Sequence, residues 1–432
     1  MLYRKLEVEL DRWKNSLSRK PLTLRGARQV GKTSLVRKWA KVNYDEFVEI
    51  NLENKDNLEV FDKVHTVSDF INKANIVTGK KIVPENSLIF IDEIQESKNL
   101  MELTRFFAEE RPDLHLIIAG SLLEAKMAGK WNVPVGRIEY MYLYPMTFFE
   151  YLKSVQKGNY LEQLEEMQFD HEVAGVSYIE NCFKDYILIG GMPAVVNNYI
   201  EIGNFSEVKN ILADLRRSFI DDIGKYTSGV ERNYVESIFK VAGNYAGQLF
   251  NYENFGDLGL KSREVSGAIR RLEQVRLLNQ VNAVNSLNIP LTYKYKRAKK
   301  MIWLDSGLAN EANGVLELIP SGIYQGRITE QIVGQTLIAT GSRREFNLSY
   351  WARNKDEGSA EVDFCYQYKN KIVGIEVKSG NTKNLKSLFS MIYNGGYMVI
   401  PVRVSWDPLK IEEYTHNSKK YKILCGLSDT FL

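Results

Sequence analysis

Hydrophobic positions in the first 155 residues follow helical spacing in some segments and form short apolar runs in others, and the two kinds of segment alternate along the chain. Four apolar positions at helical spacing predict an amphipathic helix at the start of the chain: Leu6, Leu10, Trp13 and Leu17. Apolar runs predict four buried strands, at residues 20–24, 47–52, 87–92 and 114–120, and residues 137–143 alternate as a fifth. Helical segments such as 99–110 separate these runs, and another helix begins after Pro145. Strands that alternate with helices predict an α/β domain with a parallel sheet covered on both faces.

In the middle of the chain, the apolar residues recur at helical spacing. Residues 205–226 and 233–247 predict two helices, followed by a short helix and a turn at Gly259. A further helix opens at Ser262, and strands around 277–283 and 291–296 complete a winged-helix pattern. Its outward basic residues are placed either to meet DNA phosphates or to pack against neighbours: Lys261, Arg263, Arg270 and Arg271.

The last hundred residues contain a predicted hairpin. Residues 360–368 and 371–380 read as strands joined by a two-residue turn at Lys369 and Asn370. That turn places Asp363 opposite Glu376 and Glu361 opposite Lys378, and all four side chains then share one face.

Length and composition suggest a multidomain globular protein. The chain has 432 residues, of which 44% are hydrophobic and 26% charged, so two to four domains are expected. We predict four domains, at residues 1–175, 176–240, 241–312 and 313–432. No apolar run is long enough to span a bilayer, which favours a cytoplasmic protein without a membrane partner. The three cysteines are too far apart for a disulfide framework or a zinc site and read as buried structural residues.

The charge distribution adds a weak indication of nucleic acid. The net charge is only +3, but residues 231–310 hold twelve Lys or Arg against seven Asp or Glu, including the run KYKRAKK at 294–300. Either a phosphate-binding surface or a solvated basic face accounts for this run.

A phosphate-binding loop is the clearest chemical signal. In the stretch RGARQVGKTSL, Gly26 and Gly31 are five positions apart and precede Lys32 and Thr33, between a predicted strand and a predicted helix. Glycines let backbone N–H groups converge on phosphates, the lysine reaches the outer phosphates, and the threonine hydroxyl binds magnesium. The predicted nucleotide-binding residues are Gly26, Ala27, Arg28, Gln29, Val30, Gly31, Lys32, Thr33 and Ser34.

Two carboxylates supply what such a loop needs for hydrolysis. The strand SLIFID ends in Asp92, placed to hold Mg²⁺, and Glu93 follows, placed to polarise an attacking water. The next strand ends at Ser121, a position from which a hydroxyl would sense the outer phosphate, although a simple turn explains it as well.

Five motifs resemble those of the prokaryotic AAA-type ATPase family whose members carry a C-terminal domain of unknown function. They are RKPLTLRGARQVGKTSL, LIFIDEIQE, IAGSLLE, PVGRIEYMYLYPMTFFEYL and FKDYILIGGMPAVV. The resemblance covers essentially the whole chain. It implies ATP rather than GTP, Walker A at Gly26–Thr33, Walker B at Asp92 and Glu93, and a sensor-like Ser121. It also makes Arg137 a contact to nucleotide within or across subunits of a homo-oligomer, against the simpler alternative of a surface strand residue.

The hairpin carboxylates resemble a second pattern. An Asp, then Glu-x-Lys on the adjacent strand, is the arrangement of the restriction-endonuclease-like superfamily, and this resemblance adds Glu330 from the upstream helix. It implies Mg²⁺ or Mn²⁺ held by Asp363, Glu376 and Glu330, with Lys378 stabilising charge during DNA cleavage. A cross-strand salt-bridge patch is the alternative, but two facing carboxylates repel unless a cation lies between them.

The sequence therefore predicts an AAA-type P-loop ATPase joined through helices and a winged helix to a C-terminal α/β restriction-endonuclease-like domain. The expected function is ATP-dependent work on DNA with a metal-dependent nuclease step. The alternative is an ATP-driven switch that binds protein partners and uses the C-terminal fold as an inactive scaffold.

Overall fold

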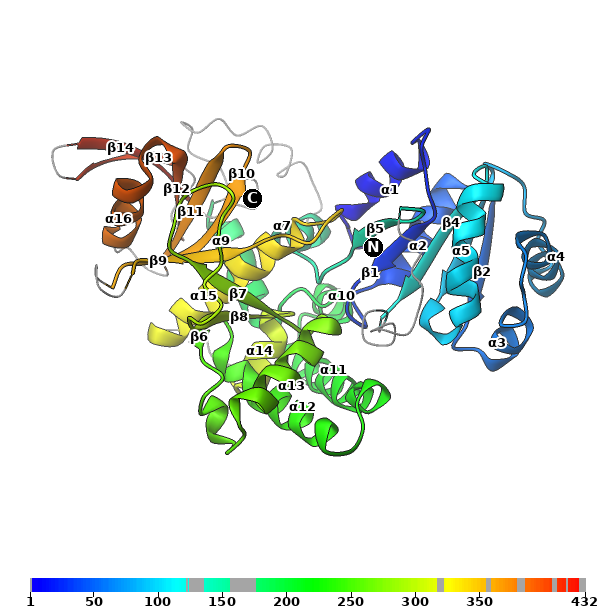
Figure 1. The fold of residues 1–432 in the computed structure, drawn as a ribbon, viewed down its shortest axis with the longest axis horizontal. Helices are drawn as coiled ribbons and strands as arrows, with labels where there is room; N and C mark the ends of the chain where they lie inside the picture. The colour runs from blue at the N-terminus through cyan, green and yellow to red at the C-terminus, as the bar shows by residue number, and fades with distance from the viewer. Residues whose placement is uncertain are drawn as a thin grey trace.

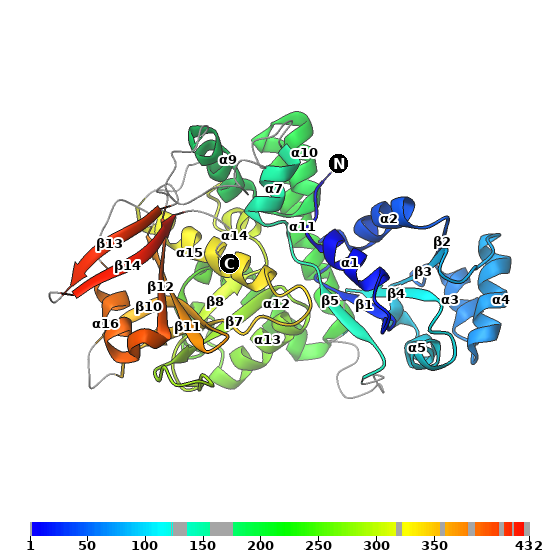
Figure 2. The ribbon, with the colours of Figure 1, turned by 90° about the horizontal axis from the view of Figure 1, so that it is seen from above.

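The computed structural model describes residues 2–121, 123, 136–155, 176–316, 322–354, 359–378, 385–405, 410–416 and 419–426. Two sheets lie at opposite sides of the molecule, with α10 (Pro193–Ile202) and α11 (Phe205–Tyr226) between them (Figures 1 and 2). Within these residues, no helix has the length and apolar character that a membrane span needs.

The N-terminal unit is built on a five-stranded parallel sheet of order β2-β3-β4-β1-β5. Its strands are β1 (Leu22–Arg25), β2 (Glu46–Asn51), β3 (Ser87–Asp92), β4 (His115–Gly120) and β5 (Glu139–Tyr142). Its helical elements are α1 (Leu6–Lys14), α2 (Lys32–Asn43), α3 (Lys55–Phe61), α4 (Val67–Thr78), the 3-10 turn η1 (Ile94–Glu96), α5 (Lys98–Glu110) and α7 (Phe148–Val155). The five predicted strands and the parallel sheet are confirmed.

Alternating residues of β3 explain why this sheet must be covered on both sides. Leu88 and Phe90 pack into one core, whereas Ile89 and Ile91 pack into a second core on the opposite face. All six residues of β3 are buried. An apolar run without a polar face therefore produces a central strand, which places Asp92 at its carboxyl end.

A helical region follows. It comprises α9 (Val176–Ile189), α10, α11, α12 (Gly229–Ala242), the 3-10 turns η2 (Gly243–Tyr245) and η3 (Phe255–Asp257), α13 (Ser262–Gln274) and α14 (Ser306–Ala312). The helix predicted to open at Ser262 is confirmed as α13, and its apolar residues Val265, Ile269 and Leu272 are buried as expected.

The second sheet has nine strands in the order β13-β14-β12-β11-β10-β9-β7-β8-β6. They are β6 (Leu249–Phe250), β7 (Leu278–Val284), β8 (Lys299–Trp303), β9 (Ser349–Ala352), β10 (Glu361–Tyr368), β11 (Lys371–Lys378), β12 (Val399–Ser405), β13 (Lys410–His416) and β14 (Lys419–Gly426), with α15 (Gly322–Ala339), α16 (Lys386–Gly395) and the 3-10 turn η5 (Gly396–Met398). Because β7 pairs with β9, this sheet crosses the boundary predicted at residue 312.

One predicted strand is wrong. Residues 291–296 are not a strand; the partner of β7 is β8, which begins three residues after the predicted strand ends, with Leu278 beside Trp303. In the 285–298 segment, Leu291 and Tyr293 instead pack on a core of the C-terminal region, and only Tyr293 bridges to β7. The alternation that resembled a strand thus reflects a loop whose apolar residues are covered on one side.

The two units meet at a tight junction around Gly190 and Gly191. The N–H of Gly191 donates to the Asp305 carboxylate at 2.6 Å, and Asp305 is fully buried. The carbonyl of Gly191 accepts from the Met146 N–H at 2.7 Å, and a Cβ on Gly191 would lie 1.9 Å from the Met146 carbonyl oxygen. Only glycine fits at this position because backbone approaches backbone directly.

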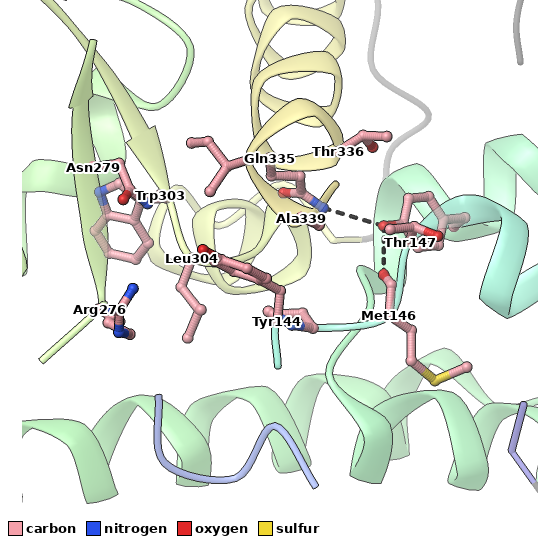
Figure 3. Close-up of a pocket in the computed structure, with 13 residues that line it drawn as sticks. Tyr144, Met146, Thr147, Arg276, Asn279, Trp303, Leu304, Gln335, Thr336 and Ala339 are labelled. Carbon is pink, nitrogen blue, oxygen red and sulfur yellow. Dashed lines mark hydrogen bonds between the residues drawn. The ribbon is translucent and has the colours of Figure 1, made fainter. Parts of the chain in front are cut away.

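A hydrogen-bond chain extends the junction into the C-terminal region (Figure 3). The Tyr186 hydroxyl donates to the Met146 carbonyl at 2.8 Å, and the Gln335 amide donates to the same hydroxyl at 3.2 Å. Trp303 and Leu304 line the small cavity of about 20 Å³ beside it. The N-terminal unit, α9, β8 and α15 therefore share one buried polar contact region.

Gly191→Ala should destabilise the protein by at least about 2 kcal/mol, because its methyl group would overlap the Met146 carbonyl. Gly267→Ala in α13 is the matched control; nothing lies within 4 Å of its added Cβ, so stability should stay level or rise by about 0.5–1 kcal/mol. Thermal unfolding measures both, and equal melting temperatures for the two variants would contradict this description of the junction.

Candidate functional site

The loop between β1 and α2 has the geometry of a phosphate-binding loop. Gly31 precedes α2 with φ 92°, in the left-handed region that favours glycine. Gly26 lies so close to the chain after β5 that an added Cβ would be 2.3 Å from the Leu143 carbonyl oxygen. Strand, loop and helix therefore follow one another as predicted, and the amino terminus of α2 faces into the loop.

Lys32 points its ammonium group back over this loop. The ammonium donates to the carbonyls of Gly26 and Ala27, each at 2.9 Å, and the residue is only 6% exposed. A cation held at the mouth of a ring of backbone N–H groups is suited to the outer phosphates of a nucleotide.

Thr33 and Asp92 lie together beside it. The Thr33 hydroxyl donates to Asp92 Oδ2 at 2.5 Å, and the other carboxylate oxygen accepts from the Glu93 N–H at 3.0 Å. Burial raises the pKa of Asp92, while the Thr33 hydrogen bond and the Lys32 charge oppose the rise. A hydroxyl and a carboxylate in contact form a hard oxygen donor pair that fits Mg²⁺.

Glu93 occupies a strained position. Its φ of 54° and ψ of 43° lie in the left-handed region, which costs a non-glycine residue about 1 kcal/mol or more. The carboxylate accepts from Ser121 Oγ at 3.3 Å and from the Gln95 amide. Two predicted site residues, Glu93 and Ser121, are thus in direct contact.

Gln95 is a site residue that the sequence analysis missed. It is 4% exposed, and its amide fixes the Glu93 carboxylate. A Cβ on Gly120 would lie 2.1 Å from Gln95 Oε1, so the glycine at the end of β4 leaves room for this amide. The only sequence signal was its position two residues after Glu93, and an isolated glutamine carries no motif.

The structure separates Arg137 from this site. β5 runs parallel to β1, with Glu139 beside Leu22 and Tyr142 beside Arg25, so Arg137 lies at the edge of the sheet opposite the phosphate loop. Its guanidinium pairs with Glu109 at 2.8 Å, at the end of α5. A contact from Arg137 to nucleotide within the same chain is therefore wrong, and a contact across subunits stays a prediction.

Comparison with known families agrees with this geometry. Residues 18–152 match the family model of the AAA domain. Residues 180–318 and 325–397 match two further families, each described only as a domain of unknown function (DUF8612 and DUF4143). No curated protein sequence matches the chain.

Solved structures give weaker similarity. RuvB of Thermotoga maritima, described as a Holliday junction branch migration motor, is 16% identical with a TM-score of 0.30, over 64% of this chain and 87% of its own. Drosophila ORC bound to DNA is 15% identical with a TM-score of 0.27, over 72% of this chain and 96% of its own. TM-scores of this size support no conclusion about function.

The phosphate loop is held by segments that lie both before and after it in the chain. Arg4 donates to the Val30 carbonyl at 2.9 Å and pairs with Glu150 at 3.4 Å; both side chains are 7% exposed. Arg28 pairs with Asp222 of α11, 194 residues away, and Asp222 also pairs with Lys225 at 2.8 Å. Thus α7, α11 and the segment before α1 all contact or support the loop.

The C-terminal carboxylates cluster as predicted, around an unexpected cation. The hairpin register is confirmed from Phe364 opposite Ile375 to Tyr368 opposite Lys371, with Lys369 in the left-handed region. Lys378 pairs with Glu376 on its own strand at 2.7 Å, rather than with Glu361 as the salt-bridge alternative implies. The cation near Asp363 and Glu330 is the ammonium of Lys300.

Charge and burial shift the pKa values in this cluster. Burial and then the charge of Asp363 raise the pKa of Glu376 to about 7, and the same two causes raise that of Glu330 to about 7. Burial lowers the pKa of Lys300, but Asp363 and Glu330 more than compensate, so that its pKa lies above the ordinary value. Lys300 therefore stays charged at neutral pH.

The basic run at 294–300 divides between surface and interior. Lys294 and Lys296 are exposed, on either side of Tyr295, which is 68% exposed. Arg297 instead donates to the carbonyls of Ala352 and Arg353, and Lys300 is buried. On α13 and its cap, Lys261, Arg263 and Arg270 are exposed, whereas Arg271 pairs with Glu231 at 2.7 Å.

Asp222→Ala should lower stability by about 1–3 kcal/mol, because it removes a buried acceptor of charge-assisted hydrogen bonds. Hydrogen exchange in residues 26–33 should accelerate as α11 releases the loop. The control is Asp214→Ala on the same helix, whose pair with Arg217 is 76% and 79% exposed and should contribute little. Identical exchange in the two variants would show that α11 does not restrain the loop.

Proposed function

We propose that this protein is an ATPase that acts on DNA. The observation that carries the ATPase assignment is a continuous set of contacts at the carboxyl edge of the AAA-domain sheet: Thr33 with Asp92, and Glu93 with Gln95 and Ser121. Phosphoryl transfer needs a phosphate grip, a metal-binding carboxylate and a water-positioning group; in this proposal Lys32 and its loop supply the first, Asp92 the second and Glu93 the third.

Each residue has a distinct role in this proposal. Lys32 stabilises negative charge on the outer phosphates. Thr33 and Asp92 would hold Mg²⁺, which neutralises developing charge between the phosphates when it is bound. Glu93 orients the attacking water, Gln95 positions the Glu93 carboxylate, and Ser121 lies where it can respond to the outer phosphate.

The DNA part of the proposal rests on charge and shape in the middle of the chain. α12, α13 and the β7–β8 pair follow one another in the order of a winged helix, and the segment joining the two strands exposes Lys294, Tyr295 and Lys296. Exposed lysines beside an aromatic ring suit phosphates and stacked bases. The α13 face adds Arg263 and Arg270.

An oligomer would give Arg137 a role that it lacks within one chain. It is 52% exposed at the sheet edge remote from its own phosphate loop, where a neighbouring subunit could receive it. Mixing an inactive Arg137→Ala protein with an inactive Glu93→Gln protein restores turnover if the arginine acts across subunits.

Lys32→Ala should abolish ATP binding, whereas Glu93→Gln should keep binding and lower turnover by roughly two or more orders of magnitude. Gln95→Leu should also keep binding and lower kcat by at least about tenfold, since it leaves the Glu93 carboxylate without its amide partner. Nucleotide-binding calorimetry and steady-state turnover separate the two effects. Equal loss of binding in all three variants would refute these roles.

Neutralising Lys294 and Lys296 to glutamine should weaken DNA binding for all sequences and reduce its salt slope by roughly one unit per lost contact. Lys63→Gln with Lys98→Gln, two exposed lysines on the AAA domain, is the control and should leave DNA binding unchanged. Fluorescence anisotropy across a salt series measures both.

DNA should also stimulate ATP turnover. If DNA neither binds to the protein nor stimulates its ATP turnover, the DNA part of the proposal fails. The ATP-driven switch that binds protein partners then becomes the better explanation.

A further inference from the structure

The carboxylate cluster of the C-terminal sheet is organised around one buried lysine. Lys300 lies on β8, and its side chain is 2% exposed. Its ammonium is 2.7 Å from Glu330 Oε2 on α15 and 3.3 Å from Asp363 Oδ1 on β10. The same group lies 4.9 Å from the centre of the Phe364 ring. Three elements distant in sequence therefore converge on one positive charge.

Two further oxygens of the cluster already accept hydrogen bonds from the chain. Asp363 Oδ2 accepts from the Val377 N–H at 2.8 Å, and Glu376 Oε1 accepts from Lys378 at 2.7 Å. Among the residues that the structure describes, no three His, Cys, Asp or Glu side chains are placed to hold one metal ion. These residues do not fit the Mg²⁺ or Mn²⁺ that the nuclease resemblance implies.

Electrostatic repulsion from Lys300 is a second reason why a divalent cation does not fit these carboxylates. A divalent cation between Glu330 and Asp363 would occupy the volume of the Lys300 ammonium or lie a few ångströms from it, and like charges that are buried together repel strongly. Moving the lysine aside would require a buried ammonium to leave both carboxylates, which is costly in an interior of low polarity.

We propose that Lys300 is the permanent cation of this cluster, so that the C-terminal sheet binds no divalent metal ion at Glu330, Asp363 and Glu376 and does not cleave DNA. The cluster instead joins β8 of the middle region to α15 and β10. The proposal explains why Glu330 and Asp363 are tolerated close together, since an ammonium ion supplied by the chain contacts both of them.

Metal binding by the full-length protein tests this directly. Mn²⁺ titrations without nucleotide, followed by electron paramagnetic resonance, should show no site in the wild-type protein that disappears in Asp363→Asn. Linear, branched and single-stranded DNA should remain uncut with Mn²⁺. A saturable Mn²⁺ site, or DNA cleavage, that Asp363→Asn removes would overturn the proposal.

Removal of the Lys300 ammonium should create a divalent-metal site that the wild-type protein lacks. Lys300→Met keeps a flexible, unbranched side chain but leaves Glu330 and Asp363 without their cation, so the melting temperature should fall by several degrees and Mn²⁺ should restore it. Lys300→Met with Asp363→Asn is the control: its melting temperature should partly recover without metal, and Mn²⁺ should have no effect. An unchanged melting temperature for Lys300→Met would refute the role of Lys300.

ATP turnover, measured on the same proteins, reports on the AAA domain separately. If Lys32→Ala abolishes turnover while Mn²⁺ binding at the cluster stays absent, both proposals hold. A failure of one leaves the other unaffected, because the two sites share no residue.

Discussion

Two buried charges of opposite sign on one short segment hold the parts of this molecule together. Lys300, on β8, pairs with carboxylates of α15 and β10, and Asp305, just after β8, accepts the N–H groups of Gly191 and Leu308. Burial raises the pKa of Asp305 to about 6 although backbone N–H groups oppose it. Each charge is tolerated only with its partners in place, since a buried charge without a partner costs several kcal/mol. Because both charges need their partners, β8 is fixed in position between the junction with the AAA domain and the C-terminal sheet.

The same junction determines what surrounds the phosphate loop. After Gly191 the chain turns into α10, and Pro193 lies within van der Waals distance of a Cβ placed on Gly31. α11 then brings Asp222 to Arg28. Helices outside the AAA domain therefore touch the phosphate loop at two points, and any change in the loop would have to be accommodated by α10 and α11. The contacts give the AAA domain and the rest of the chain a shared boundary.

Prediction from the sequence succeeded in placing the strands and the loop of the N-terminal unit. The phosphate loop, Asp92, Glu93 and Ser121 follow strands whose apolar runs are unambiguous, and parallel strands bring their carboxyl ends to one edge. It failed where a residue's role depends on distant partners. Arg137 lies just before β5, and because β5 runs parallel to β1 it is at the edge of the sheet opposite the phosphate loop. Gln95 matters because Gly120, on another strand, leaves room for its amide.

The sequence by itself determined the α/β character of the N-terminal unit, the identity of the phosphate loop and the register of the C-terminal hairpin, because side-chain periodicity and turn length act over a few residues. Only the tertiary structure decided which members of a charged run face water. Lys294, Lys296, Arg297 and Lys300 look alike in the sequence, yet the first two are exposed, the third binds backbone carbonyls and the fourth is buried among carboxylates. Charge is a property of the residue, but its effect depends on the dielectric and on the partners around it, and these come from segments far away along the chain.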